Sequence, residues 1–139
     1  MNKPLLNADL GEGFDGDADM FPLLDLANIA CGGHVGDAQT IRRAMDQAHG
    51  LPVKLGAHPS YPDRAGFGRA RPTGPLNALY SSLCTQMDLF ENMAARQGLK
   101  TQHWKPHGQL YNDAAVQADV AGVVLRVAQD YPHLSLLVL

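Results

Sequence analysis

The chain has 139 residues, 45% of them hydrophobic, and its 14 acidic residues outnumber its 11 lysines and arginines, giving a formal net charge of −3 at pH 7. This length allows one domain with a buried core, and the lack of a Lys/Arg cluster excludes nucleic acid as a main partner, because phosphate binding needs a concentrated basic surface. No apolar run is long enough to span a bilayer and no basic segment precedes an apolar one at the N-terminus, so we expect a cytoplasmic protein without a membrane partner.

The first predicted strand covers residues 4–9, PLLNAD, where apolar and polar residues alternate. Asn7 and Asp9 lie on the same side of this strand. A glycine-rich acidic turn follows, and residues 20–26, MFPLLDL, predict a short helical segment. The first strand therefore carries polar side chains at its end.

A second predicted strand, residues 28–30, runs into a glycine-rich turn that carries His34. Glycine permits backbone angles that residues with a Cβ avoid. Asp37 can accept hydrogen bonds from the free N–H groups of a helix that the apolar spacing predicts over residues 38–49. A strand-to-helix turn of this kind is a typical place for a site in an α/β protein.

The third predicted strand, residues 53–58, places Lys54 and His58 on one face. The loop that follows it, residues 59–75, is long and irregular. Apolar residues then recur at helical spacing and predict a helix from residue 76 to about residue 98. Polar residues again come at the end of a strand.

The fourth predicted strand, residues 101–105, places His103 and Lys105 on one face. We expect a loop over residues 106–112. The valines that follow recur at helical spacing and predict one helix over residues 113–131.

This order of elements predicts a mostly parallel sheet with helices packed outside it. A flat, doubly wound sheet would have near-continuous apolar strands, because helices cover both of its faces. Here polar residues lie on or just after every one of the first four predicted strands: Asn7, Asp9, Asn28, Lys54, His58, His103, Lys105 and His107. The pattern favours a TIM-barrel-like α/β fold whose interior reaches the site.

The last six residues, 134–139, are almost wholly apolar and predict a strand at or near the end of the sequence. A closed eightfold barrel needs a longer chain. We therefore expect a single domain over residues 1–139 that holds the N-terminal half of such a barrel and is truncated on its C-terminal side.

Ionisable side chains gather at the predicted strand ends, which right-handed connections bring to one rim of the sheet. Each residue alone has an ordinary explanation, such as a solvated cap, but loop ends do not favour histidine and lysine. Carboxylates near imidazoles and an ammonium group can transfer protons, orient water or stabilise an oxyanion. The candidate catalytic residues are Asp9, Glu12, His34, His58, Lys105 and His107.

The same rim could instead bind a divalent, zinc-like ion through Asp9, His34, His58 and His107. No short motif such as HExxH holds these residues together, so the presence of a metal stays open. The glycine-containing GEG and GFG segments match no complete phosphate-binding motif. Arg64 and Arg69, on either side of GFG, could clamp a carboxylate or a phosphate.

A resemblance to a known family rests on four segments that occur in this order: NADLGEGFDGD, ANIACGGHVGD, GAHPSYPDRAGFGR and KPHGQLYND. They are similar to motifs of the LamB/YcsF family of 5-oxoprolinase A subunits. The resemblance implies a barrel related to the glycoside hydrolase/deacetylase barrels. It also implies ATP-dependent opening of 5-oxoproline (pyroglutamate) to L-glutamate, with ATP as co-substrate, in a complex with two partner subunits of the allophanate-hydrolase type.

The resemblance carries over a set of rim positions without fixing their individual roles. The sequence departs from the family at Gly33, where an aromatic residue is usual. We expect a looser pocket wall there. Asn7, Arg64 and Arg69 are added to six positions that the resemblance carries over. The expected substrate-binding residues are therefore Asn7, Asn28, Asp37, Tyr61, Asp63, Arg64, Arg69, Tyr111 and Asn112.

Two other interpretations stay open. The first is an ATP-independent metal hydrolase of the deacetylase type, with Asp9 and histidines as ligands. The second is a non-catalytic subunit that binds 5-oxoproline and docks its partners while the chemistry takes place elsewhere.

Overall fold

The computed structural model describes residues 3–139, so Met1 and Asn2 of the expected domain lie outside the described residues. Within that range five parallel strands form one sheet, in the order β1-β2-β3-β4-β5. The strands are β1 (Asn7–Leu10), β2 (Leu26–Ala30), β3 (Lys54–His58), β4 (Thr101–Trp104) and β5 (Ser135–Leu136). The helices are α1 (Asp17–Met20), α2 (Ala38–Ala48), α3 (Leu76–Arg96), α4 (Gly108–Val116) and α5 (Ala118–Asp130), with a 3-10 turn, η1 (Phe21–Leu23).

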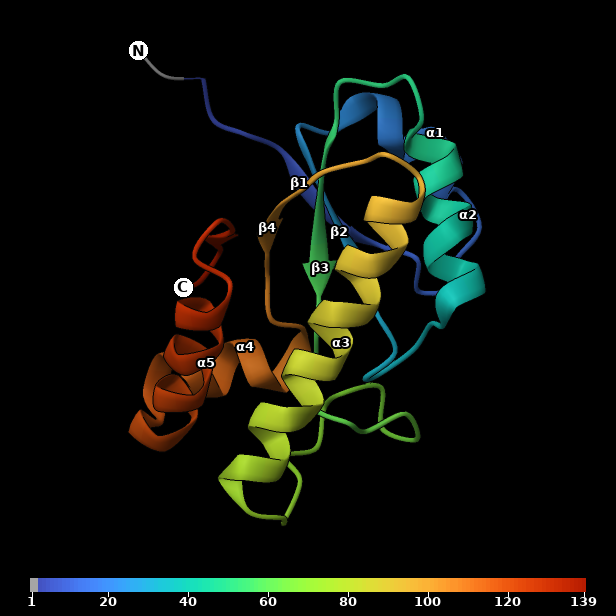
Figure 1. Ribbon diagram of the computed structural model, residues 1–139. Coiled ribbons are helices and arrows are strands. Elements are labelled where there is room, and N and C mark those ends of the chain that lie inside the picture. The colour runs from blue at the N-terminus through green and yellow to red at the C-terminus, as the bar shows by residue number, and fades with distance from the viewer. Residues whose placement is uncertain (1–2) are drawn as a thin grey trace.

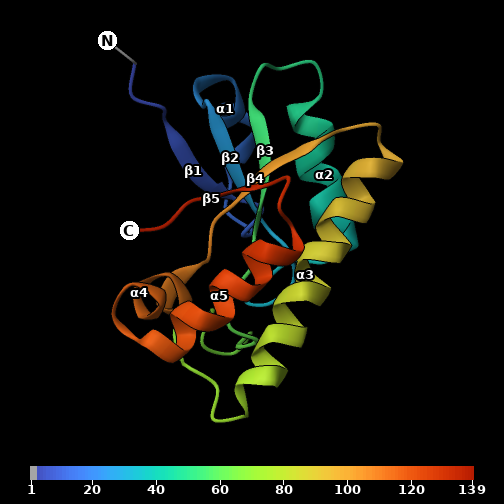
Figure 2. The same cartoon turned by 60° about the vertical axis from the view of Figure 1, so that its left-hand side comes forward.

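The expected α/β class is confirmed. Each strand pairs with the next one along the chain, which is how neighbouring strands are arranged in a TIM-like barrel. Over residues 3–139 the sheet is open, with β1 and β5 at its edges. Helices α2 and α3 lie side by side against one face of the sheet, and α5 packs beside α3 (Figures 1 and 2). The carboxyl ends of the strands therefore meet at one edge.

The strand register aligns the polar residues of successive strands. Asp9 is opposite Asn28, Asn28 is opposite Gly56, and Gly56 is opposite His103. Further along the strands, Ala30 is opposite His58. Because side chains alternate along a strand, these rows lie on the same face of the sheet, away from the core.

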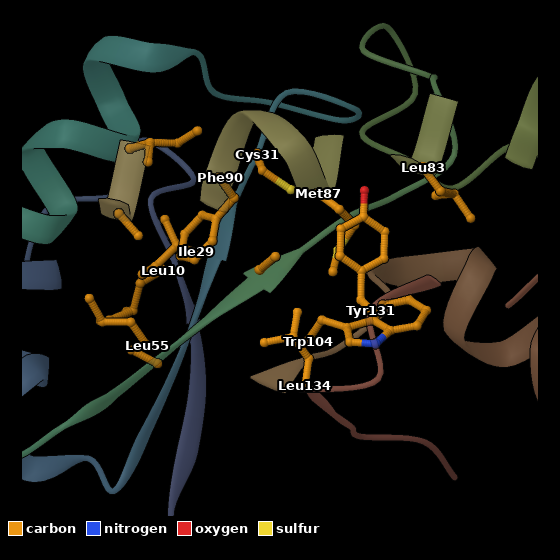
Figure 3. Close-up of a cluster of buried hydrophobic side chains, with 14 of the residues drawn as sticks. Leu10, Ile29, Cys31, Leu55, Leu83, Met87, Phe90, Trp104, Tyr131 and Leu134 are labelled. Carbon is orange, nitrogen blue, oxygen red and sulfur yellow. The ribbon is translucent and has the colours of Figure 1, made fainter. Parts of the chain in front are cut away.

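The apolar side chains of the opposite face form the core against the helices (Figure 3). Burying a large apolar side chain contributes about 1.5–3 kcal/mol, so this layer holds the strands, and with them the strand ends, in place. The cluster contains Leu10, Ile29, Leu55 and Trp104 from the strands and Leu83, Met87 and Phe90 from α3, with Tyr131 and Leu134 beyond α5.

The first strand begins later than expected. Residues 4–6 were predicted as strand but lie exposed before β1, which begins at Asn7. Pro4 has no N–H to donate to a ladder, and Leu6 meets β2 through its carbonyl, which accepts from the N–H groups of Asp25 and Leu26. The alternating pattern thus predicted the strand correctly but not its start.

The region after the fourth strand differs more. The loop expected over residues 106–112 is mostly helix, because α4 begins at Gly108. Asp113 was expected to start a helix but lies inside α4, where its buried carboxylate accepts hydrogen bonds from Tyr61 and Gln109 instead of capping. The single helix expected over 113–131 is broken at Gln117, whose backbone is extended with φ −117° and ψ 112°.

No helix among residues 3–139 is both long and apolar enough to cross a membrane. In the same range Cys31 and Cys84 are free thiols. Burial raises the pKa of the Cys31 thiol to about 12, so it stays protonated inside the core.

Candidate active site

The structure brings the candidate catalytic side chains together at the carboxyl ends of β1 to β4. Figure 1 shows the arrow of β3 pointing toward this end, where the following loop and α4 lie. The cluster consists of Asp9 in β1, Glu12 in the turn after it, His34 after β2, His58 at the end of β3, and Lys105 and His107 after β4. Side chains that are distant in sequence therefore share one site.

Glu12 lies at the closed side of the cluster. Its Oε1 is 2.8 Å from His34 Nε2, 3.3 Å from His107 Nδ1 and 3.8 Å from His58 Nε2. The rings of His34 and His107 stack with centroids 3.5 Å apart and an angle of 5° between them. One carboxylate oxygen thus faces three buried imidazoles.

Asp9 lies at the more open side. Its Oδ1 accepts from Lys105 Nζ and from Asn28 Nδ2, each at 3.0 Å. Its other oxygen, Oδ2, lies 3.3 Å from His58 Nε2. The Asp9 and Lys105 side chains are 34% and 20% exposed, so a ligand from solvent can reach this side of the site.

Both carboxylates are ionised at neutral pH. Burial works to raise the pKa of Asp9, but His58, Asn28 and Lys105 outweigh it and hold that pKa well below its usual value. Burial also opposes ionisation of Glu12, but the neighbouring His107 and His34 lower its pKa to about 2. The site therefore concentrates negative charge against imidazoles.

The loop after β3 closes over the histidines, through residues that sequence reasoning missed. Phe67 has a positive φ of 56°, which no other non-glycine residue among 3–139 shows, and its carbonyl lies 2.9 Å from His107 Nε2. Its ring meets the His34 and His107 rings edge-on at 5.0 and 5.3 Å. The only sequence signal was an aromatic residue between two glycines, and the strained backbone at a site is a typical mark of function.

A second polar network, within the sheet, holds Asp9 in place. His103 Nε2 donates to Asn28 Oδ1 at 2.8 Å, and Asn28 Nδ2 donates to Asn7 and Asp9. The His103 ring reaches Asn28 across Gly56, where a Cβ would lie 2.3 Å from the ring. His103 thus orients the amide that orients the carboxylate, and its place on the polar face was the signal that could have identified it.

His103 makes a testable contribution to stability. Burial lowers its pKa from 6.5 to about 4, so between these values the unfolded chain binds a proton that the folded chain does not. Stability is therefore lost as pH falls from 6.5 toward 4, by about 1 kcal/mol per pH unit for this one group. We expect His103→Gln to flatten the decline in unfolding free energy measured in urea between pH 6.5 and pH 4. The exposed His49→Gln should keep the wild-type slope, and an unchanged slope in His103→Gln would contradict the assignment.

Three of the expected substrate-binding residues lie at the cluster. Asn7 and Asn28 belong to the network that holds Asp9 in place. The Tyr111 ring in α4 lies 5.5 Å from Lys105 Nζ, a cation–π distance, on the open side of the site.

The other expected substrate-binding residues serve the surrounding backbone or lie outside the network. Asp37 caps α2 by accepting from the N–H of Thr40. Arg64 donates to the carbonyls of Gly32 and Gly36, and these bonds tie the loop after β3 to the loop after β2. The rest are Asp63, which accepts from two N–H groups of its own loop, Tyr61, which donates to Asp113, Arg69, which lies 5.8 Å from the Phe67 ring, and Asn112, which is exposed on α4.

Gly33 has no room for a larger side chain, and the expected looser pocket wall beside it stays a prediction. A Cβ at Gly33 would lie 2.4 Å from both Gln86 Oε1 and Ser60 Oγ. Gln86 accepts from the N–H of Ser60 and donates to its carbonyl. This buried pair from α3 and the loop after β3 takes the volume that a larger residue at position 33 would need.

Two overlapping groups of side chains could hold a metal ion. Asp9, His58 and His107 form one group, and Glu12, His34 and His107 form the other. Within each group the ligand atoms lie within 4.8 Å of one another. His107 is common to both groups.

Two comparisons relate the chain to known proteins. The sequence model of the LamB/YcsF family matches residues 5–139. The crystal structure of the lactam utilization protein from Thermus thermophilus superposes with a TM-score of 0.92 and 36% sequence identity. The similarity covers 99% of this chain and 58% of that protein.

Proposed function

Because the chain belongs to the LamB/YcsF family, we propose that it is a subunit of an ATP-dependent 5-oxoprolinase that opens 5-oxoproline to L-glutamate. 5-Oxoproline is a five-membered lactam, and the similar structure is that of a lactam utilization protein. The observation that carries the proposal is the convergence of two carboxylates, three imidazoles and one ammonium group at one edge of the sheet.

A lactam is a poor electrophile, which explains the expected need for ATP. In the proposed reaction the lactam oxygen attacks the γ-phosphorus of ATP and ADP leaves, so the ring carbon becomes part of an activated imidate. Water then attacks this carbon. Hydrolysis releases phosphate and opens the C–N bond to give the amine and the new carboxylate of glutamate.

The proposed roles follow from the positions of the side chains. Glu12 or Asp9, both ionised, orients the attacking water through an oxygen acceptor. His34, whose Nε2 lies 2.8 Å from Glu12 Oε1, takes the proton and later returns it to the leaving nitrogen. Lys105, on the open side, neutralises negative charge on the substrate or on the developing oxyanion.

The expected partners belong to the same proposal. They are ATP, 5-oxoproline and two allophanate-hydrolase-type subunits, in the cytoplasm, where ATP is available. The chain spans 58% of the length of the lactam utilization protein. A reconstitution can therefore also show whether this chain is sufficient for turnover with its partners.

The test is a reconstitution with the two partner subunits of a bacterial 5-oxoprolinase. We expect 5-oxoproline-dependent release of glutamate and phosphate only when the chain, both partners and ATP are all present. Turnover without ATP that a chelator abolishes would instead identify a metal hydrolase of the deacetylase type. Equal turnover with and without the chain would overturn the proposal.

A further inference from the structure

We propose that His58, His107 and Asp9 bind one divalent transition-metal ion of the zinc class, with the Glu12 carboxylate close beside them. The inference rests on where the protons of the two imidazoles must lie. It concerns binding alone and is tested by binding rather than by turnover, so its failure can be distinguished from failure of the 5-oxoprolinase proposal.

The first step concerns His58, which is 1% exposed. Its Nδ1 lies 2.7 Å from the backbone carbonyl of Lys105. A carbonyl can only accept a hydrogen bond, so Nδ1 carries the proton. The neutral His58 ring therefore directs the lone pair of Nε2 into the site.

The second step concerns His107, which is 8% exposed. Its Nε2 lies 2.9 Å from the carbonyl of Phe67, so Nε2 carries the proton and the lone pair is on Nδ1. His107 Nδ1 and His58 Nε2 are 3.0 Å apart. Two lone pairs at this separation repel each other unless a cation lies between them, which must be a metal ion or an added proton.

The third step uses the carboxylates to choose between these cations. Asp9 Oδ2 lies 3.3 Å from His58 Nε2, and Glu12 Oε1 lies 3.3 Å from His107 Nδ1. A bridging proton serves only two of these acceptors, whereas one metal ion can bind three at once, as the grouping of Asp9, His58 and His107 allows. Bonds of about 2.0–2.2 Å to one ion place neighbouring ligand atoms about 3–3.5 Å apart, in agreement with these separations.

The surroundings hold each ligand in a fixed orientation, as in known metal sites. Backbone carbonyls fix both rings. Asn28 and Lys105 bind Asp9 Oδ1, which leaves Oδ2 directed at His58. His34 Nε2 lies 2.8 Å from Glu12 Oε1, the same oxygen that faces His107.

The donor types select the class of ion. Two imidazole nitrogens with carboxylate oxygens suit Zn²⁺ and related transition metals, whereas Mg²⁺ and Ca²⁺ prefer sites made wholly of oxygen. The proposal therefore commits to Zn²⁺ binding with little competition from Mg²⁺.

The test is calorimetric titration of Zn²⁺ into the chelator-treated protein, with Mg²⁺ titrated in parallel. We expect one Zn²⁺ per chain, and a loss of affinity of about 100-fold or more in His58→Ala and in His107→Ala, because each substitution removes a direct ligand rather than a group that only orients one. The exposed His49→Ala should bind as the wild type does. Affinity unchanged in both ligand variants would place the ion elsewhere and overturn the proposal.

A second measurement guards against variants that fail to fold. In the wild-type protein, the ¹⁵N resonances of the imidazoles report which nitrogens carry protons. We expect Zn²⁺ to shift His58 Nε2 and His107 Nδ1 while the other nitrogen of each ring stays protonated. An imidazolium in this pair that persists with excess Zn²⁺ would show that a proton fills the position, and would refute metal binding.

Discussion

Replacement of His107 by alanine is expected to lower 5-oxoproline turnover by the reconstituted enzyme by about 100-fold, because its ring positions Glu12 and a misplacement of about 1 Å at a reacting group costs that much. His107 contacts three other members of the cluster. It lies 3.3 Å from Glu12 Oε1 and 3.0 Å from His58 Nε2, and its ring stacks on His34. The measurement is kcat for glutamate release, with circular dichroism to verify that the variant folds.

The matched control for this variant is His49→Ala, which removes an exposed imidazole at the end of α2. It should retain wild-type kcat. A folded His107→Ala protein that turns over within about threefold of the wild type would remove His107 from the reaction.

Gly68→Ala is expected to destabilise the fold by about 2–4 kcal/mol and to disturb the site at the same time. Gly68 has a φ of +73°, and a Cβ there would lie 2.8 Å from His107 Cδ2 and 3.0 Å from His34 Cβ. The methyl group would therefore add a collision with both stacked histidines to the usual strain of a left-handed residue. Urea unfolding measures the loss of stability.

Gly50→Ala separates these two contributions. Gly50 has a similar φ of +78°, but a Cβ there would meet no atom within 4 Å. We expect it to show the backbone cost alone, about 1–2 kcal/mol, with wild-type turnover. Equal losses of stability in the two variants would show that the rings are not packed against Gly68 as described.

The cluster could be predicted from the sequence because one rule of parallel sheets relates the order of the strands to the position of their ends. Parallel strands with right-handed connections end at the same edge, so polar residues at successive strand ends must meet. Asp9, His34 and His58 could each be assigned to such an end from hydrophobic alternation and glycine turns. Their approach to one another followed without any knowledge of the distances.

The rest depended on register and on local competition for hydrogen bonds. His103 supports Asn28 only because Gly56 lies between them in the sheet, and the pairing of strands cannot be read from either strand alone. Asp37 and Arg64 are residue types that often bind substrates. Here the Asp37 carboxylate accepts from a free N–H at the start of α2, and the Arg64 guanidinium donates to a backbone carbonyl. Helix α4 was missed because proline and glycine usually mark a loop, whereas here they precede and begin a helix.

The most direct test of the central claim is a crystal structure of the assembled enzyme with 5-oxoproline and a non-hydrolysable ATP analogue. The claim is that the lactam is opened at the carboxyl ends of β1 to β4. We predict the lactam carbonyl carbon about 3–3.5 Å from a water held by Glu12 or Asp9, with Lys105 facing the substrate. A lactam bound at another surface, out of reach of both carboxylates and of the histidines, would contradict the account.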